Sequence, residues 1–193
     1  MSSSPIPSSR WQTVQLCDVE PSPWRNGGGT TRELFAWPAA QAWQWRASVA
    51  EVTQAGAFSN FGGVQRWFAV LEGDGVCLTV DGHLHVLSKA DSPLEFDGAA
   101  QTECKLLGGA TQDFNLMVRN PAKARMQRVI DRLKVTTDAP KIVAFYAYEQ
   151  TARVQIGTKN HVLSSGTFGW THVVENEAIQ VDASDALFVE IDI

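Results

Sequence analysis

Long hydrophobic runs are missing from this sequence of 193 residues. The longest strongly apolar stretch, Ile142 to Tyr148, is strand-sized and far below the roughly 18–20 residues that a membrane-spanning helix needs. Charge is also scarce, since charged residues make up 19% of the chain and the formal net charge is −5. No basic block occurs, so we expect neither nucleic acid nor a membrane as a partner.

Cysteine is rare, and the three cysteines are not spaced as pairs. Cys17, Cys77 and Cys104 are widely separated, and no Cys-x-x-Cys motif occurs. This usage excludes a disulfide framework and fits a reducing cytoplasm. Residues 1–10 lack the basic and apolar regions of a secretory signal, so we predict a flexible lead-in there and a cytoplasmic protein.

Familiar catalytic and metal-binding motifs are absent as well. Neither Gly-x-Ser-x-Gly nor His-Glu-x-x-His occurs. His83 and His85 share one face of an expected strand, but no third ligand is near them in sequence. Surface histidines are the better interpretation, and we expect no metal and no cofactor.

Strand and turn signals fill most of the chain. Asp81-Gly82 is a strong hairpin dipeptide, and similar turn signals recur between short apolar runs. This rhythm predicts an all-β fold, and it appears in two halves, at residues 65–100 and 141–193. The one helix candidate is Ala122 to Leu133, for which a charged β-hairpin is the alternative. Residues 136–140 are the best candidate for an internal linker.

Two segments carry polar side chains suited to ligand binding. Residues 23–34 combine three consecutive glycines with two arginines, an asparagine and two threonines, which are donors suited to an anion. In residues 113–119, period-two alternation places Asp113, Asn115, Met117 and Arg119 on one face and apolar residues on the other. A solvated face is the alternative interpretation. Arg66 shares a strand face with apolar residues, either lining a pocket or holding the strand through an ion pair with an acid such as Glu51.

Several motifs in order along the chain resemble the HutD/Ves family. They are Trp-Arg-Asn-Gly-Gly-Gly-Thr-Thr-Arg-Glu at 24–33, Trp-Arg-Ala-Ser-Val-Ala at 45–50, the segment at 56–66, Leu-Glu-Gly-Asp-Gly at 71–75, and Asp-Phe-Asn-Leu-Met-Val-Arg at 113–119. The resemblance spans residues 11–193 and implies a bicupin, that is, two cupin-like β-barrels in one chain. We place the approximate lobes at 11–135 and 136–193. The strands that would hold a cupin metal contain no histidine here, which also argues against a metal.

The resemblance implies a small-molecule-binding modulator of histidine catabolism whose ligand is a small acidic metabolite such as formylglutamate. Carried over by motif, the candidate ligand-binding residues are Trp24, Arg25, Asn26, Gly28, Thr30, Arg32, Glu33, Ser59, Phe61, Arg66, Asp113, Asn115 and Arg119. One alternative is a metal-free cupin enzyme, a hydrolase or isomerase, with Glu33 or Asp113 as general base. Another is a protein-interaction module with tryptophan anchors. A homodimer is possible.

Overall fold

The computed structural model describes residues 10–193, and these residues are almost entirely β-structure. The only helical element in this range is the short 3-10 helix η1 (Leu16–Asp18), so the predicted all-β class is confirmed. No helix in the described range is long and apolar enough to cross a membrane. The predicted lead-in at 1–10 lies outside the described residues, apart from Arg10.

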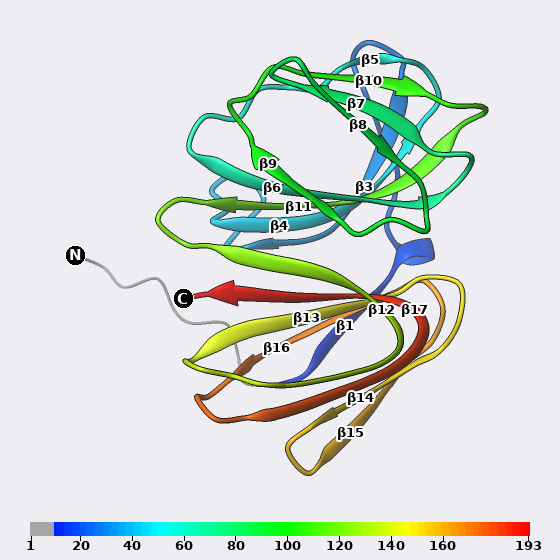
Figure 1. Ribbon diagram of the computed structural model, residues 1–193. Helices are drawn as coiled ribbons and strands as arrows, with labels where there is room; N and C mark the ends of the chain where they lie inside the picture. Colours follow the sequence, from blue (N-terminus) through cyan, green and yellow to red (C-terminus); the bar gives the residue numbers. More distant parts are fainter. Residues whose placement is uncertain (1–9) are drawn as a thin grey trace. The chain divides into compact units, whose positions relative to one another are not determined.

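The chain divides into two compact units (Figure 1). The N-terminal unit is Val19–Pro121. The C-terminal unit is Ala122–Ile193 together with the described residues up to Asp18. The division lies between Pro121 and Ala122, whereas the sequence analysis placed it between residues 135 and 136.

Two antiparallel sheets form the N-terminal unit. The first has six strands in the order β2-β3-β4-β11-β6-β9 and the second has four in the order β5-β10-β7-β8. Their bounds are β2 Ser22–Pro23, β3 Gly29–Trp37, β4 Trp45–Val52, β5 Gly56–Ala57, β6 Val64–Glu72, β7 Val76–Val80, β8 His83–Leu87, β9 Leu94–Asp97, β10 Thr102–Leu106 and β11 Thr111–Arg119.

Alternating apolar residues from both sheets make the core of this unit. Phe68 and Val70 of β6 pack with Val76 and Leu78 of β7 and with Cys104 of β10 in one buried cluster. Because strand side chains alternate between faces, the same pattern that fills this core directs every second residue of β4, β6 and β11 to one side of the six-stranded sheet. Those positions build the pocket described below.

A single curled sheet forms the C-terminal unit (Figure 1). Its strand path is β1-β16-β13-β17-β14-β15, and β12 pairs with β17. The bounds are β1 Gln12–Gln15, β12 Ala124–Thr136, β13 Lys141–Ala147, β14 Ala152–Ile156, β15 Lys159–Leu163, β16 Thr167–Val173 and β17 Ala178–Asp192. Strand β17 changes partner from β14 to β13 at residues 183–185.

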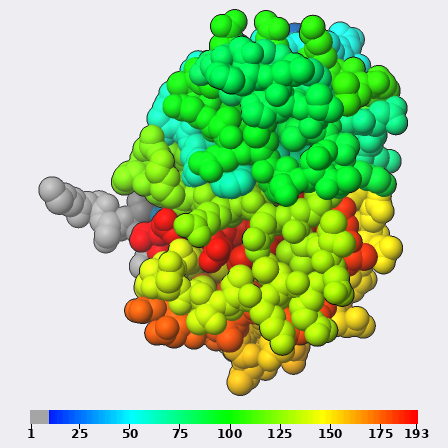
Figure 2. All heavy atoms as spheres, viewed as in Figure 1, coloured from blue at the N-terminus to red at the C-terminus, as the bar shows by residue number. Residues whose placement is uncertain are grey.

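The helix candidate at Ala122 to Leu133 is wrong, and so is its hairpin alternative. The segment is the long strand β12, which pairs along its whole length with β17, and its exposed side chains cover much of the visible face of this unit (Figure 2). A register shift next to Asp131, whose φ is 77°, marks a bulge in β12. Because β12 takes its partner from the end of the chain, it belongs to the C-terminal unit. The candidate linker at 136–140 is therefore a connection within one unit.

Candidate ligand-binding site

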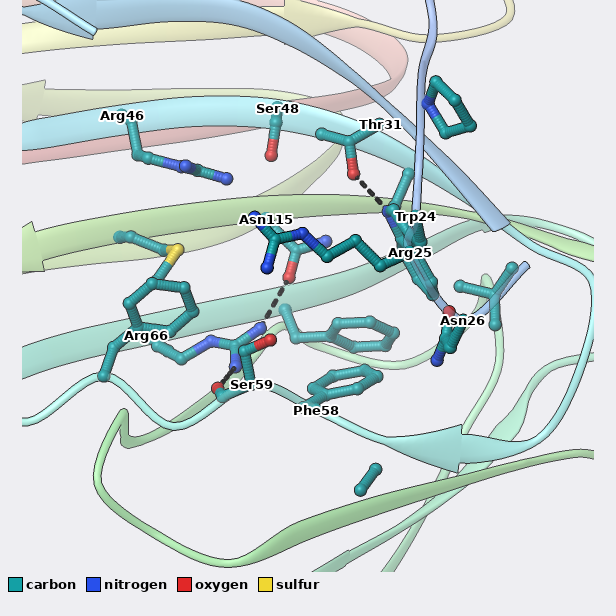
Figure 3. A pocket seen from close by; sticks show the side chains of 17 residues that line it. Trp24, Arg25, Asn26, Thr31, Arg46, Ser48, Phe58, Ser59, Arg66 and Asn115 are labelled. Carbon is teal, nitrogen blue, oxygen red and sulfur yellow. Dashed lines mark hydrogen bonds between the residues drawn. The ribbon is translucent and has the colours of Figure 1, made fainter. Parts of the chain in front are cut away.

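A cavity of about 480 Å³ opens on the inner face of the six-stranded sheet in the N-terminal unit. The strands β3, β4, β6 and β11 form its floor, and the segments around residues 23–26 and 57–61 form its rim. It is lined by Pro23, Trp24, Arg25, Asn26, Thr31, Arg46, Ser48, Ala50, Val52, Ala57, Phe58, Ser59, Phe61, Arg66, Phe68, Asn115 and Met117 (Figure 3). Its volume lies within the range of roughly 300–1,000 Å³ that is usual for small-molecule sites.

Strand register explains which side chains reach the cavity. Met117 of β11 pairs with Arg46 on one side and with Arg66 on the other, so all three face the pocket in one row. The next row is Ser48, Asn115 and Phe68. Phe114, Leu116 and Val118 of β11 face the other way and are fully buried. The prediction that Asn115 and Met117 share a face is therefore confirmed, and that face looks into a cavity.

Arg66 is the most unusual residue of the site because it is a buried cation, only 7% exposed. Its guanidinium donates to Asn115 Oδ1 at 3.2 Å and to the Ser59 carbonyl at 3.4 Å, and its Nε has no partner. The rings of Phe58 and Phe96 lie 5.0 Å from the guanidinium carbon. Burial, and secondly the positive charge of Arg46, lower the pKa of Arg66 to about 10.

Arg46 brings a second positive charge to the same cavity. Its guanidinium forms a long ion pair with Glu33, 3.6 Å between Nη1 and Oε2, and its buried Nε has no partner. Two strand spacings separate the backbones at Arg46 and Arg66, roughly 10 Å. No aspartate or glutamate is among the lining residues of this cavity, all of which the structure describes. The pocket is therefore electropositive.

The rim segment Trp24-Arg25-Asn26 closes one side of the pocket. The indole of Trp24 donates to Thr31 Oγ1 at 2.7 Å, which fixes the ring against β3. Asn26 Oδ1 accepts from the amide of Gly28 at 3.1 Å, and this side-chain turn shapes the glycine run. Arg25 is exposed and extends from the Trp24 side toward the cavity that Arg46 also enters (Figure 3).

We expect Gly29→Ala to destabilise the protein by about 1–3 kcal/mol or more, because a Cβ at this position would lie 2.2 Å from the Glu51 carbonyl oxygen and 3.2 Å from the Trp24 ring. Gly28→Ala is the matched control, since the nearest atom to its Cβ would be Asn26 Oδ1 at 3.4 Å. Chemical denaturation of the two variants measures the difference. Equal stabilities would contradict a packing role for Gly29.

The structure brings together seven of the thirteen candidate residues at this pocket. They are Trp24, Arg25, Asn26, Ser59, Phe61, Arg66 and Asn115. Six others, Gly28, Thr30, Arg32, Glu33, Asp113 and Arg119, do not line it. Gly28 shapes the turn, Glu33 contacts the pocket through Arg46, and Thr30 lies on β3 next to the lining residue Thr31.

Arg32 and Arg119 are engaged elsewhere. Arg32 donates to the Val19 carbonyl at 2.6 Å. It follows Thr31 on β3, and alternation turns it away from the cavity. Arg119 donates from Nε to the Trp43 carbonyl at 3.0 Å, and its guanidinium lies 4.3 Å from the Trp43 ring. Of the four arginines that the sequence nominated as anion partners, the pocket therefore holds two.

Asp113 lies on the pocket-facing side of β11 but is completely buried. Thr111 Oγ1 donates to its Oδ2 at 2.8 Å, while Oδ1 has no hydrogen-bond partner. Burial raises the pKa of Asp113 to about 7, and the hydrogen bond from Thr111 offsets only part of this effect. Asp113 is not among the residues that line the cavity.

Ten of the seventeen lining residues were not among the sequence candidates, and three of these, Arg46, Ser48 and Phe58, are the ones that matter most for the site. The signal for two of them was present, because Arg46, Ser48 and Ala50 alternate along β4 as Asn115 and Met117 do along β11. Phe58 lies in a connection between strands, and no periodic pattern identifies it.

The histidine pair singled out in the sequence lies on β8, where His83 is exposed and His85 half-buried. Within residues 10–193, no group of three or more histidine, cysteine, aspartate and glutamate side chains could hold a metal ion. The three cysteines are free thiols.

Comparison with known proteins identifies the family. The family model described as HutD matches residues 17–190. The chain belongs to the HutD family. An uncharacterized 21.2 kDa protein encoded in the region 3′ of hutC in Pseudomonas putida is 36% identical over 142 residues, which cover 72% of this chain and 75% of that protein. Protein Ves of Escherichia fergusonii is 38% identical over 130 residues, 64% of this chain and 67% of that protein.

Solved structures of HutD-like chains share the whole fold. A conserved protein of unknown function from Pseudomonas aeruginosa PAO1 has a TM-score of 0.86 at 28% identity, covering 96% of this chain and 100% of that one. HutD from Pseudomonas fluorescens SBW25 has a TM-score of 0.78 at 28% identity, covering 94% and 98%. A variant of Bacillus subtilis oxalate decarboxylase reaches 0.58 at 8% identity, covering 93% and 76%, which shows that the HutD fold is cupin-like.

Proposed function

We propose that this HutD-family protein binds a small carboxylate metabolite in the pocket of its N-terminal unit, and that binding rather than turnover is its function. The observation that carries the proposal is Arg66. Among residues 10–193 this buried guanidinium has no carboxylate partner, its Nε has no acceptor, and it faces the same cavity as Arg25 and Arg46. A buried charge normally has a counterion. A bound anion would supply one.

The pocket favours a ligand with more than one acidic group. Arg46 and Arg66 each have a buried Nε without an acceptor, and their backbones are separated by two strand spacings. Each planar guanidinium can bind one carboxylate in a bidentate manner. In the next row, Asn115 lies on β11, the strand between those of the two arginines, and Ser48 lies beside it on β4. Their amide and hydroxyl are available to a polar group in the middle of the ligand. A formylated amino dicarboxylate such as N-formylglutamate has this pattern.

The enzyme alternative has less support. The described lining residues include no aspartate, glutamate, histidine, cysteine, lysine or tyrosine, which are the usual general acids and bases. The two carboxylates that the alternative requires, Glu33 and Asp113, lie outside the cavity lining.

We assign the ligand to histidine catabolism because of the family and because the Pseudomonas putida relative is named for its position beside hutC. In this proposal the protein is a cytoplasmic sensor or modulator of a pathway acid. We also propose that the two β-units correspond to two cupin-like barrels, of which only the N-terminal one binds the ligand. The interior of the C-terminal unit supports this division, because it is filled by a cluster of apolar side chains that includes Val143, Phe145 and Phe188.

The test is a thermal-shift and calorimetric panel of histidine-pathway acids at millimolar concentration. N-formyl-L-glutamate at 100 times its dissociation constant would stabilise the folded protein by about 2.7 kcal/mol. The matched ligand control is N-formylglutamate diamide, which keeps the shape but not the negative charges and is expected to give no shift. Chromatography of the ligand after incubation should recover it unchanged.

Two outcomes would overturn this function. If no acid in the panel changes the melting temperature or binds in the calorimeter, the carboxylate-binding proposal fails. If the ligand is consumed at a steady rate proportional to the protein concentration, binding without turnover fails and the enzyme alternative replaces it.

A further inference from the structure

Trp43 forms a wall behind the pocket without lining it. The indole is buried, 7% exposed, and belongs to a cluster with Val64 and Met117, against which Phe61 packs. Its ring meets the ring of Phe61 edge-on, with centroids 6.4 Å apart. Both Met117 and Phe61 line the cavity. Trp43 therefore packs behind the end of the pocket at which Arg46 lies.

Arg46 itself rests on Trp43. Its guanidinium carbon lies 5.6 Å from the centre of the indole, within cation–π range. The only ion pair of Arg46 in the described chain is the long one to Glu33, and a flexible side chain with one long ion pair is weakly held. The indole surface is thus a principal constraint on where this guanidinium can lie.

Arg119 holds Trp43 from outside the pocket. Its Nε donates to the Trp43 carbonyl and its guanidinium carbon is 4.3 Å from the same indole. Its backbone amide also donates to the Gln44 carbonyl at 2.7 Å, so the end of β11 is tied to the segment that carries Trp43. Arg119 is exposed and outside the cavity lining, so it does not contact a ligand there.

We infer that Arg119 is a positioning residue, which acts through Trp43 to hold Arg46 in the orientation that binds the second acidic group of the ligand. This inference rests on the proposed function and assigns a role to a residue that the motif resemblance placed in direct contact with the ligand. A residue that acts through Arg46 must lose its effect on affinity when Arg46 is absent.

The experiment is a double-mutant cycle with N-formyl-L-glutamate as the probe. Calorimetry compares wild type, Arg119→Ala, Arg46→Ala and the double variant. Arg119→Ala is expected to weaken binding about tenfold in the wild-type background and less than twofold when Arg46 is already alanine. Arg153→Ala removes an exposed arginine of the C-terminal unit and is the matched control, expected to bind as wild type.

Arg119→Lys separates geometry from charge. It keeps the positive charge but loses the planar group that stacks on the indole, so it should lose most of the affinity as well. It also serves in place of Arg119→Ala in the cycle if that variant fails to fold. Wild-type affinity in Arg119→Lys would assign the effect to net charge and overturn the inference.

Failure of the inference and failure of the function are distinguishable. If wild type does not bind the probe, the proposed function fails. If wild type binds and Arg119→Ala binds equally well, or weakens binding by the same factor with and without Arg46, then Arg119 does not act through Arg46 and the inference is overturned.

Discussion

Replacing Arg66 with methionine is expected to stabilise the ligand-free protein by about 1–4 kcal/mol while abolishing its response to carboxylate ligands. Arg66 is 7% exposed and has no acid partner in the described chain. A buried charge without a counterion opposes folding, whereas methionine of similar length can pack against Phe58 and Phe96. The Arg66 side chain therefore destabilises the ligand-free protein and at the same time binds the ligand.

The pKa of Arg66 gives the size and the sign of this cost. The lowering of this pKa to about 10 corresponds to roughly 3 kcal/mol. Because the folded-state pKa is the lower one, the folded state disfavours the charged guanidinium at every pH below about 10. The penalty is fully present at neutral pH and is relieved only as the pH rises above about 10. The two acceptors that methionine leaves behind, on Asn115 and Ser59, line an open cavity where water can replace the lost donors.

Urea denaturation with and without N-formyl-L-glutamate measures both effects at once. A rise in the transition midpoint at unchanged slope reports the gain in stability. Arg153→Met is the matched control, since it removes an exposed arginine and should change stability by no more than about 0.5 kcal/mol. The opposite result, a clear loss of stability with an intact ligand response, would show that Arg66 holds the fold. The structure does not show the ion pair with Glu51 that such a role would require, because Glu51 is exposed and no ion pair joins the two.

Local periodicity accounts for the parts of the fold and site that the sequence predicted well. Alternation along residues 113–119 identified the inward face of β11, and the apolar run Ile142 to Tyr148 located β13 to within one residue. The same alternation separates Arg66, which faces the cavity, from Arg32, whose neighbour Thr31 faces it instead. Applied to β4, it would have found Arg46 as well.

Contacts between distant residues account for what the sequence did not predict. The sequence of β12 favours a weak helix prediction because its charged residues recur without a clear period of two. Its pairing with β17 is what makes it a strand. That pairing also moves the division between the units to Pro121. The motif resemblance implies that Arg119 contacts the ligand, yet Arg119 contacts Trp43, which is 76 residues away in sequence. No local pattern reports a partner at that distance.

We expect the wild-type protein to lose stability as the pH rises because Asp113 ionises, and we expect Asp113→Asn to remove this loss. Asp113 is fully buried and one of its oxygens has no partner. Cys104 is a titratable group that interacts with Asp113, and burial, followed by the charge of Asp113, raises the pKa of Cys104 to about 12, so that thiol stays neutral. Ionisation of Asp113 in this apolar surrounding is therefore uncompensated apart from the hydrogen bond from Thr111.

The pKa of Asp113 is raised from 3.8 to about 7, so the folded state binds its proton more tightly than the unfolded state does. Between these two values the folded state holds more protons, and the free energy of unfolding must fall as the pH rises. The loss is complete above about pH 7 and amounts to roughly 4 kcal/mol at 1.36 kcal/mol per unit. Asparagine cannot ionise, and its carbonyl can still accept from Thr111. Its buried amide adds a constant cost of about 1–3 kcal/mol, which is the same at every pH.

Chemical denaturation at several pH values from 4 to 8 gives the free energy of unfolding of wild type and of Asp113→Asn. The difference between the two free energies isolates the contribution of Asp113. Every other titrating group contributes to both proteins and cancels in the difference. We expect the variant to gain roughly 4 kcal/mol relative to wild type across this range, with most of the change between pH 4 and pH 7. Asp18→Asn, at an exposed position, should run parallel to wild type. A parallel curve for Asp113→Asn would mean that Asp113 is ionised in the folded protein with a compensating partner. In that case the buried oxygen would be paired in solution and would not oppose folding.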